Sequence, residues 1–256
     1  MKVALLYIGI GRYVCFWDDF YKTCEQNFLP GVEKHYFFAT DHVADMPQNV
    51  TLIYQEDLGW PCNTMFRFMF FLRVKEQLKG FDYIYFCNAN TRFRAVVAPE
   101  EIVPDKQEED GGLLMLTWQA PDGDPETFGF ERRKESAACV PLGTKQPYYQ
   151  GTLNGGTAEA FIGLLEGCHE IIMTDFKNGI VPSAHDESAL NKYMIGRSCK
   201  LVDSVYGRPE HRDKDHTAKI VFADKGRVLG RSYLRHFKKR SHSNTCLRKL
   251  LRCLGF

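Results

Sequence analysis

Two asparagines one residue apart are the first feature of this chain with the type and spacing for ligand chemistry. Asn88 and Asn90 directly follow residues 81–87, an apolar run typical of a buried strand. Asparagine is a poor ligand for a hard divalent cation unless carboxylates accompany it. A nucleotide-sugar site built on this pair is therefore predicted to work without metal. The alternative is that both asparagines only form the turn that follows the strand.

Two adjacent carboxylates are the second such feature. Asp186 and Glu187 open a segment in which Leu190 and Met194 fall on one helical face. Paired carboxylates beside a cleft suit glycosyl chemistry, because one can bind sugar hydroxyls while the other stabilises, or attacks, an electron-poor anomeric carbon. The alternative is a capping box with Ser183 as the N-cap and Asp186 three residues later. Capping would account for Asp186 but not for Glu187.

The elements that must position these residues alternate between strand and helix patterns. Strands are expected at residues 3–8, 35–39, 81–87 and 113–118, and helices at residues 16–28, 63–78 and 157–168 and from about Ser183. The polar residues 119–147 predict a long loop with one helical turn. This alternation indicates an α/β sandwich with a largely parallel sheet, whose ligands bind beyond the carboxyl ends of the strands.

The charge of the chain is unevenly distributed. Among 256 residues, 44% are apolar and 25% charged, as in an ordinary globular protein. Residues 225–256 contain ten Lys and Arg and no Asp or Glu, so the rest of the chain carries 23 basic and 32 acidic residues. This asymmetry predicts that the tail meets an anionic partner. No nucleic-acid motif accompanies it, so a nucleic acid is not the expected partner.

The end of the tail has the pattern of a basic amphipathic helix. Leucines at 247, 250, 251 and 254 share one face, and basic residues at 248, 249 and 252 lie opposite. Such a helix binds an anionic membrane surface, and packing on the protein's own core is the alternative. We therefore expect a single catalytic domain over residues 1–235 and a basic amphipathic tail over residues 236–256.

Cysteine usage and hydropathy predict a cytoplasmic protein. The nine cysteines are odd in number and none has C-x-x-C spacing, which favours reduced, buried thiols over disulfides or a zinc site. No apolar stretch approaches the roughly twenty residues that cross a bilayer, and no signal peptide precedes Lys2. The expected location is the cytoplasm, at the inner face of the membrane if the tail binds lipid.

Five motifs in order carry a resemblance to a known family. They are Asp57-Leu58-Gly59-Trp60-Pro61 with Asn63, Thr64 and Arg67; Asn88-Ala89-Asn90; Tyr148-Tyr149-Gln150-Gly151-Thr152; Asn154-Gly155-Gly156; and His185-Asp186-Glu187-Ser188 with Leu190-Asn191-Lys192-Tyr193. Over residues 3–206 the chain resembles glycosyltransferase family 6, which includes the histo-blood-group A and B transferases and the α-1,3-galactosyltransferases. It is most similar to the short bacterial members, which carry Asn-Ala-Asn in place of Asp-Val-Asp.

The resemblance implies a GT-A fold and retaining transfer of galactose or N-acetylgalactosamine from a UDP donor to the 3-position of an acceptor galactose. By position, Ile8, Ile10 and Tyr13 would hold the uridine, Thr64 and Arg67 would contact the donor, Asn88 and Asn90 would line the ribose and diphosphate, and Gln150, Gly151 and Thr152 would read the 2-substituent. Asp186 would bind donor hydroxyls, and Glu187 would be the nucleophile or the cation stabiliser. No metal or other cofactor is expected.

Loss of a metal requires other cations to neutralise the departing UDP. Arg67 is the first candidate, because an arginine fork suits phosphate oxygens. Lys225, Arg227 and Arg231 are the next, since the family's C-terminal segment closes over the diphosphate. A solvated tail is the alternative for those three residues.

Two departures from the family pattern fall on the acceptor side. Thr117-Trp118-Gln119-Ala120-Pro121 replaces His-Pro-Gly-Phe-Tyr, and Ala184 replaces a tryptophan, so Trp118 and Ala184 mark the predicted acceptor site. Thr152 is β-branched where users of the acetylated donor have glycine, which favours galactose. A decayed, non-catalytic sugar-nucleotide-binding protein is the main alternative. A Rossmann dinucleotide site at Gly9-Ile10-Gly11 is disfavoured because Val14 occupies the third glycine position.

Overall fold

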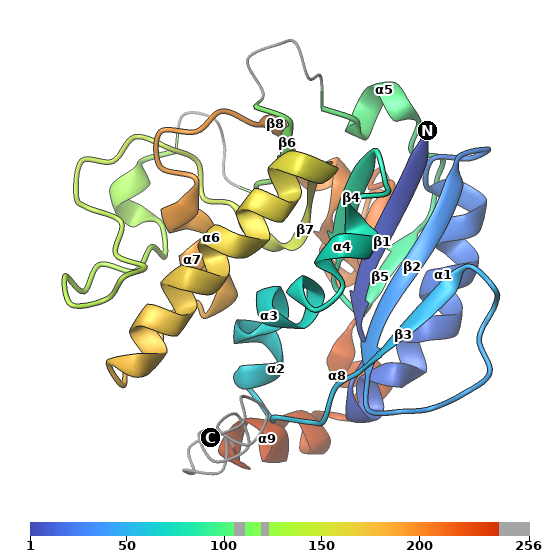
Figure 1. Cartoon of the computed structure of the whole chain (residues 1–256), viewed down its shortest axis with the longest axis horizontal. Helices are drawn as coiled ribbons and strands as arrows, with labels where there is room; N and C mark the ends of the chain where they lie inside the picture. Colours follow the sequence, from blue (N-terminus) through green and yellow to red (C-terminus); the bar gives the residue numbers. More distant parts are fainter. Residues whose placement is uncertain (105–110, 119–122, 241–256) are drawn as a thin grey trace.

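The computed structural model of the chain describes residues 1–104, 111–118 and 123–240, and its centre is a seven-stranded sheet (Figure 1). The strand order is β3 (Val50–Tyr54), β2 (Glu33–Thr40), β1 (Lys2–Ile8), β4 (Tyr83–Cys87), β7 (Gln150–Thr157), β6 (Leu113–Leu116) and β8 (Lys200–Val202). Every neighbouring pair is parallel except the two made by β7, which is antiparallel to β4 and β6. The predicted α/β architecture with a largely parallel sheet is confirmed, and it is consistent with a glycosyltransferase fold.

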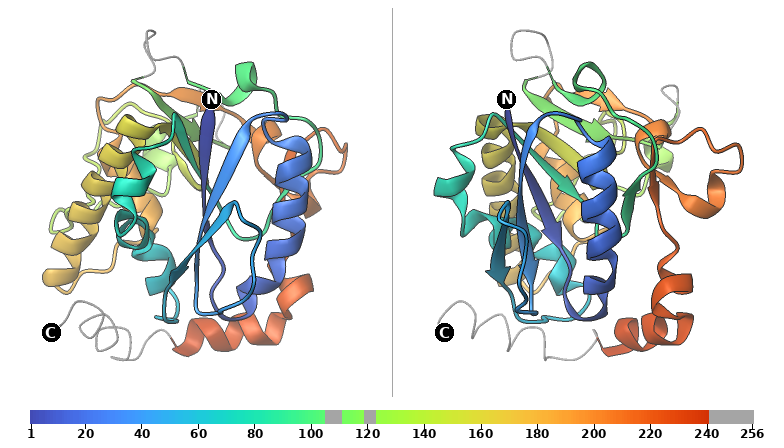
Figure 2. Two further views of the ribbon diagram at one scale, coloured as in Figure 1. Left: turned by 45° about the vertical axis from the view of Figure 1, so that its right-hand side comes forward. Right: turned by 90° about the vertical axis from the view of Figure 1, so that its right-hand side faces the viewer.

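Helices cover both faces of this sheet, and β1 shows why its sequence is almost continuously apolar. Val3, Leu5 and Tyr7 pack on one face against α1 (Trp17–Asn27), which follows the 3-10 turn η1 (Gly11–Phe16). Ala4 and Leu6 belong to the core on the other face, with α3 (Arg67–Leu72) and α6 (Ala158–Lys177). Figure 2 shows α1 and α6 on opposite sides of the sheet. A strand buried on both faces needs apolar residues at every position.

The region predicted as one helix over residues 63–78 forms three short helices instead. These are α2 (Cys62–Met65), α3 and α4 (Lys75–Leu78), with breaks at Phe66 and Val74. The phenylalanines at 66, 68, 70 and 71 are all at most 1% exposed. A continuous helix would spread positions 66, 68, 70 and 71 around its circumference, and the breaks let all four rings reach the core.

One further boundary differs from the sequence prediction. The helix predicted over residues 157–168 continues to Lys177 as α6. Gly155 and Gly156 lie inside β7. A Cβ atom on Gly155 would stand 2.2 Å from the Tyr85 ring, and one on Gly156 would stand 2.4 Å from the Gly112 carbonyl oxygen. These glycines therefore serve close packing of neighbouring strands.

The C-terminal part of the described chain returns beneath the Asn88–Asn90 turn. A small sheet contains β5 (Thr91–Phe93), β10 (Ile220–Phe222) and β9 (Arg208–Pro209), in the order β5-β10-β9. It leads into α8 (Lys225–Leu229) and α9 (Arg231–Arg240), which lie across the end of the molecule where β1 and β4 finish (Figure 1). The predicted boundary between residues 235 and 236 falls inside α9, and the division into two modules stays a prediction.

The remaining elements are short and lie in connections. They are α5 (Pro99–Ile102), η2 (Pro125–Thr127), α7 (Asp186–Tyr193), η3 (Ser204–Tyr206) and η4 (Glu210–Arg212). The described part of the predicted long loop contains the expected helical turn, η2. Phe130 and Val140 of this loop form an apolar cluster with Tyr148, the residue that follows the loop, and the polar composition of the loop did not predict this cluster.

Most of the cysteines have the predicted redox state, but fewer have the predicted burial. Six are reduced thiols, at positions 15, 24, 87, 139, 168 and 199; of these, Cys24, Cys87 and Cys168 are buried, whereas Cys15 is exposed. Cys62 is disulfide-bonded, so the prediction of reduced thiols throughout is wrong at this residue. Cys246 and Cys253 lie outside the described residues, as does the leucine face of the tail. None of the helices described has the length and apolar character needed to span a bilayer.

Candidate functional site

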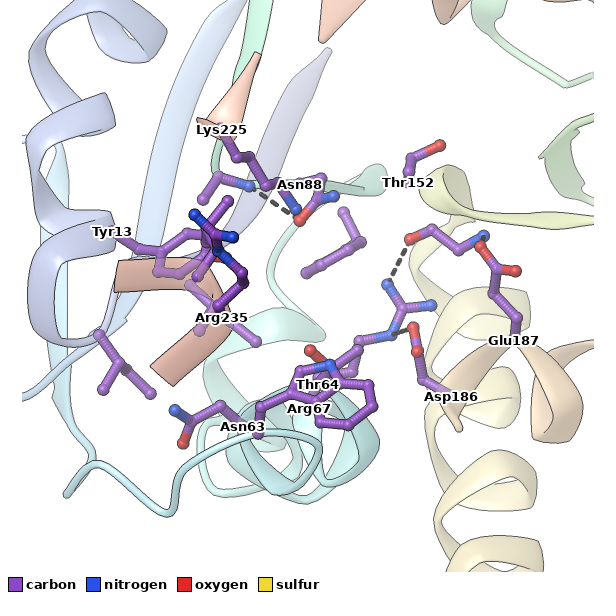
Figure 3. A pocket seen from close by; sticks show the side chains of 17 residues that line it. Tyr13, Asn63, Thr64, Arg67, Asn88, Thr152, Asp186, Glu187, Lys225 and Arg235 are labelled. Atoms are coloured by element: carbon purple, nitrogen blue, oxygen red, sulfur yellow. Dashed lines mark hydrogen bonds and ion pairs between the residues drawn. The ribbon is translucent and has the colours of Figure 1, made fainter. Parts of the chain in front are cut away.

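A cavity of about 460 Å³ opens at the carboxyl ends of β1 and β4, the edge where α/β sheets bind ligands (Figure 3). Six separate segments enclose it: the end of β1 with η1, the α2–α3 region, the end of β4, the start of β7, the start of α7, and the α8–α9 region. Most of the predicted donor residues line it, namely Ile8, Ile10, Tyr13, Thr64, Arg67, Asn88, Gly151, Thr152, Asp186, Glu187 and Lys225. The sequence prediction thus brought together residues up to 217 positions apart, from Ile8 to Lys225.

Several predicted residues do not line this cavity. They are Asn90, Gln150, Arg231, Trp118 and Ala184. Six residues line the cavity although no individual role was predicted for them: Trp60, Asn63, Phe86, Ala89, Leu234 and Arg235. Trp60 and Asn63 belong to a motif that carried the family resemblance, so the motif was the available signal. Arg235 lay in the predicted basic stretch without being singled out.

Arg67 lines the cavity although it is buried, at 2% exposed. Its Nη1 donates to the Gly151 carbonyl oxygen at 2.8 Å, and its Nη2 donates to Asn154 Oδ1 at 3.4 Å. Its Nε lies 3.0 Å from Asp186 Oδ2 in an ion pair without forming a hydrogen bond to it. Arg67 thus holds Asp186 and β7 beside the cavity.

Asp186 is a buried acid that is paired with Arg67. It is 5% exposed, and burial raises the pKa of its carboxyl group to about 7, against which the positive charge of Arg67 acts. Burial also lowers the pKa of the Arg67 guanidinium, an effect opposed by the Asp186 charge. Both shifts have the same physical cause, which is the loss of water around each charge. For Asp186, burial therefore outweighs the opposing effect of the Arg67 charge on the pKa of the carboxyl group.

Glu187 is half-buried and held at both carboxylate oxygens. Oε1 accepts a hydrogen bond from the Gly151 backbone N–H at 2.8 Å, and Oε2 accepts one from the Tyr148 hydroxyl at 2.9 Å. Burial, followed by the charge of Glu187, raises the pKa of Tyr148 far above its ordinary value. The phenol therefore stays protonated and acts as a donor. The sequence prediction quoted Tyr148 in a motif but gave it no role.

Gly151 separates the two carboxyl groups and has no room for a side chain. A Cβ atom there would stand 2.8 Å from Asp186 Oδ2 and 2.8 Å from Glu187 Cγ. Its N–H binds Glu187 and its carbonyl binds Arg67. The backbone of this one residue of β7 thus holds Glu187 directly and Asp186 through Arg67, which requires a glycine here whether or not a sugar is bound.

The start of α7 differs from the predicted capping box. The helix begins at Asp186, with His185 as its N-cap residue at φ 53° and no side-chain capping bond. Ser183 instead donates its backbone N–H to Glu131 Oε2 at 2.8 Å, and Ser188 Oγ accepts from the Ala184 N–H. The predicted N-cap at Ser183 is therefore wrong, because Ser183 binds Glu131 of the preceding long loop and does not cap the helix. Asp186 is left to pair with Arg67.

The two asparagines have different surroundings. Asn88 is half-buried and faces the cavity (Figure 3). Asn90 is 5% exposed and joins Ala223 twice: its side-chain Nδ2 donates to the Ala223 carbonyl oxygen at 2.6 Å, and its backbone carbonyl oxygen accepts from the Ala223 N–H at 2.8 Å. The expectation that Asn90 lines the ligand site is not met by this geometry. Asn90 anchors the end of β10, two residues before Lys225.

Cations from the C-terminal segment reach the cavity. Lys225 Nζ lies 5.5 Å from the centre of the Tyr13 ring, and Arg235 of α9 also lines the cavity (Figure 3). Arg231 is exposed and lies outside the lining. Among the described residues, no three His, Cys, Asp or Glu side chains gather as metal ligands do. Metal independence stays a prediction.

The predicted acceptor residues lie outside the cavity lining. Trp118 is 38% exposed, and its indole N–H donates to the Gly207 carbonyl at 2.5 Å. Ala184 precedes His185, whose ring meets the Trp60 ring edge-on with centroids 4.8 Å apart. Trp60 therefore contacts the residue that follows Ala184.

Comparison with known proteins gives a consistent family. The model of Glycosyltransferase family 6 matches residues 1–222. The O-antigen biosynthesis glycosyltransferase WbnI of Escherichia coli is 33% identical over 231 residues, which cover 89% of this chain and 96% of that protein. Histo-blood group ABO system transferase 2 of Rattus norvegicus is 29% identical over 203 residues, covering 75% and 59%. Globoside alpha-1,3-N-acetylgalactosaminyltransferase 1 of Homo sapiens is 24% identical over 233 residues, covering 86% and 65%. The chain spans less than two thirds of these two mammalian relatives.

Proposed function

The chain belongs to glycosyltransferase family 6, and we propose that it is a retaining, metal-independent enzyme that acts on a surface glycan. It transfers galactose or N-acetylgalactosamine from a UDP-sugar to the 3-position of a galactosyl acceptor, forming an α-1,3 linkage. Family membership supports glycosyl transfer itself. The donor, the linkage and the metal independence are the parts that we propose.

The observation that carries the proposal is the arrangement of Asp186 and Glu187 at the floor of the cavity. Glu187 has its carboxylate oriented by two donors, and Asp186 is paired with Arg67. A preorganised carboxylate can attack the anomeric carbon or stabilise the positive charge that develops there. The neighbouring Asp186 can bind donor hydroxyls. This division of roles requires two carboxyl groups in different environments, which the site provides.

Lys225 and Arg235 are the proposed substitutes for a metal. Departure of UDP places additional negative charge on the diphosphate, and cations from α8 and α9 line the same cavity as Asn88. Charge-assisted contacts to phosphate are strong in a partly water-excluded site. Because Arg67 is paired with Asp186, the neutralising role passes to these two residues.

UDP release measured in excess EDTA tests this function. The wild-type protein should release UDP from UDP-galactose or UDP-N-acetylgalactosamine, at a rate that acceptor increases and manganese changes little. Glu187→Gln should keep UDP affinity within about threefold and lower turnover by about 10²-fold or more. Activity lost on chelation and restored by manganese would refute metal independence. UDP binding without any release, in wild type and variant alike, would favour the decayed sugar-nucleotide-binding protein.

The proposed setting is the cytoplasmic face of a membrane, where a lipid-linked glycan acceptor would be found. The Escherichia coli relative is named for O-antigen biosynthesis, which supports a surface-glycan acceptor. The proposed contact is the basic tail of residues 236–256, since each basic residue near anionic lipid contributes about 1 kcal/mol. Deletion of residues 241–256 should abolish co-sedimentation with anionic vesicles and leave activity on a small soluble acceptor. Unfolding of the truncated protein would assign the leucine face to the core.

A further inference from the structure

We infer that Tyr148 is a positioning residue that orients the Glu187 carboxylate for reaction at the anomeric carbon. This inference rests on the proposed role of Glu187. It adds a residue from outside the cavity lining, because Tyr148 does not line the donor cavity itself. Its contribution passes through Glu187.

The hydrogen bond between these residues fixes the half of the carboxylate that the backbone leaves free. Gly151 N–H holds Oε1, and the Tyr148 hydroxyl holds Oε2 at 2.9 Å. Within the part of the chain that the structure describes, Oε2 accepts from no other side chain. With only the Gly151 bond, the carboxylate plane could turn about the Oε1 contact. With both bonds, one remaining lone pair on each oxygen has a defined direction.

The position of the Tyr148 hydroxyl is itself tightly constrained. Its side chain is 7% exposed and packs with Phe130 and Val140 in the apolar cluster of the long loop. The Phe130 and Tyr148 rings have centroids 5.4 Å apart. A phenol on a fixed ring has one soft torsion, the rotation of its own hydrogen. The cluster therefore holds the Tyr148 hydroxyl at the Glu187 carboxylate.

A second set of hydrogen bonds joins the segment before β7, which carries Tyr148, to helix α7, which carries Glu187. The buried Asn191 side chain accepts from the Tyr149 N–H at 2.9 Å and donates to the Tyr149 oxygen at 3.0 Å. The same amide donates to the Glu187 carbonyl oxygen at 2.8 Å. This side chain ties the backbone beside Tyr148 to the first turn of α7. The phenol and the carboxylate cannot move apart without breaking these bonds.

Removal of the phenol hydroxyl should therefore affect reaction more than binding. Catalysis depends on placing reacting atoms to within a fraction of an ångström. Tyr148→Phe keeps the ring and its packing and removes the donor. We expect kcat to fall by about 10- to 100-fold, as for loss of a hydrogen bond to a charged group, and KM for the UDP-sugar to stay within about threefold.

A double-mutant cycle with Glu187→Gln tests the inference. If Tyr148 acts through Glu187, then Tyr148→Phe should lower kcat little when Glu187 is already glutamine, whereas independent effects would multiply. Tyr206→Phe is the matched control, since it removes a 2.8 Å tyrosine–glutamate bond, to Glu101, away from the cavity. The control should keep wild-type kcat. Thermal melting and UDP affinity report whether each variant folds.

The outcomes separate this inference from the proposed function. An inactive Glu187→Gln with a fully active Tyr148→Phe would overturn the Tyr148 role alone. A fully active Glu187→Gln would overturn the function of Glu187 and this inference with it. Multiplicative losses would assign Tyr148 a role unrelated to the carboxylate and overturn the inference. If Tyr148→Phe fails to fold, 4-fluorophenylalanine at position 148 fills the space of the hydroxyl without donating, and the same cycle applies.

Discussion

Addition of one methyl group at Gly151 should disable the site, and the structure gives the size of the effect. The Cβ atom of Gly151→Ala would lie 2.8 Å from Asp186 Oδ2 and 2.8 Å from Glu187 Cγ, whereas ordinary contacts begin at 3.4 Å. The neighbours must therefore retreat by about 0.6 Å. Asp186 is held by Arg67 and Glu187 by Tyr148, so neither can move without loss of an interaction.

This displacement should reduce turnover much more than it reduces stability. Overpacking of this kind costs about 1–3 kcal/mol of folding free energy. Displacement of reacting groups by about 1 Å lowers rates by about 100-fold, so a shift of about 0.6 Å should lower kcat by about 10- to 100-fold. UDP release under saturating donor gives kcat, calorimetric titration with UDP gives the donor affinity, and thermal melting gives the stability.

Gly163→Ala is the matched control. Its Cβ atom would meet only the Tyr193 hydroxyl, at 3.5 Å, and it lies inside α6, where alanine stabilises a helix by roughly 0.5–1 kcal/mol relative to glycine. The control should melt no earlier than wild type and keep full turnover. Gly151→Ala with wild-type turnover would show that the two carboxyl groups need no fixed placement, and the reasoning would fail.

Three further outcomes are expected. Folding raises the pKa of Asp186 from its ordinary 3.8 to about 7, so the folded state binds this proton more tightly than the unfolded chain. The folding free energy that the bound proton contributes is therefore lost as pH rises from about 4 to about 7. Denaturant titrations should show this loss of stability with pH in wild type and not in Asp186→Asn. Lys225→Gln should raise KM for the UDP-sugar about tenfold and make KM less dependent on salt. Lys22→Gln, on the exposed face of α1, should change neither KM nor its salt dependence. Equal salt dependence of KM in wild type and both variants would exclude Lys225 from the diphosphate site. Wild type should prefer UDP-galactose when both donors compete, and Thr152→Gly should shift the ratio toward the acetylated donor; an initial preference for the acetylated donor would show that Thr152 points away from C2.

The fold was predictable because its signal is local and repeated. Buried strands are short apolar runs, and the helices between them show apolar residues at helical spacing. The alternation therefore identified the α/β class even where boundaries were wrong. The three short helices of residues 62–78 were not predictable, because their breaks depend on which core each phenylalanine must reach. That requirement is set by distant parts of the chain.

The residues of the site were largely predictable from motifs, but their contacts were not. Arg67 had the chemistry of a phosphate ligand, yet its partners Gly151, Asn154 and Asp186 lie at least 84 residues away in sequence. Tyr148 binds Glu187, which lies 39 residues further along the chain. Its ring is held by Phe130 and Val140, which belong to a loop predicted to be polar. A side chain's role follows from its partners, and non-local partners leave no trace in local spacing.

The Asn-Ala-Asn motif shows how one pattern can combine two roles. The amide of Asn90 donates to the Ala223 carbonyl at 2.6 Å, a contact that an ionised aspartate could not make, since it has no hydrogen to give. An aspartate there would face a carbonyl oxygen in a buried site, which is unfavourable. The neutral residue at position 90 is thus explained by the anchoring of the segment that carries Lys225. Asn88 faces the cavity and is the member of the pair left to meet a ligand. The amide at position 90 therefore holds the segment that brings Lys225 to the cavity that Asn88 lines.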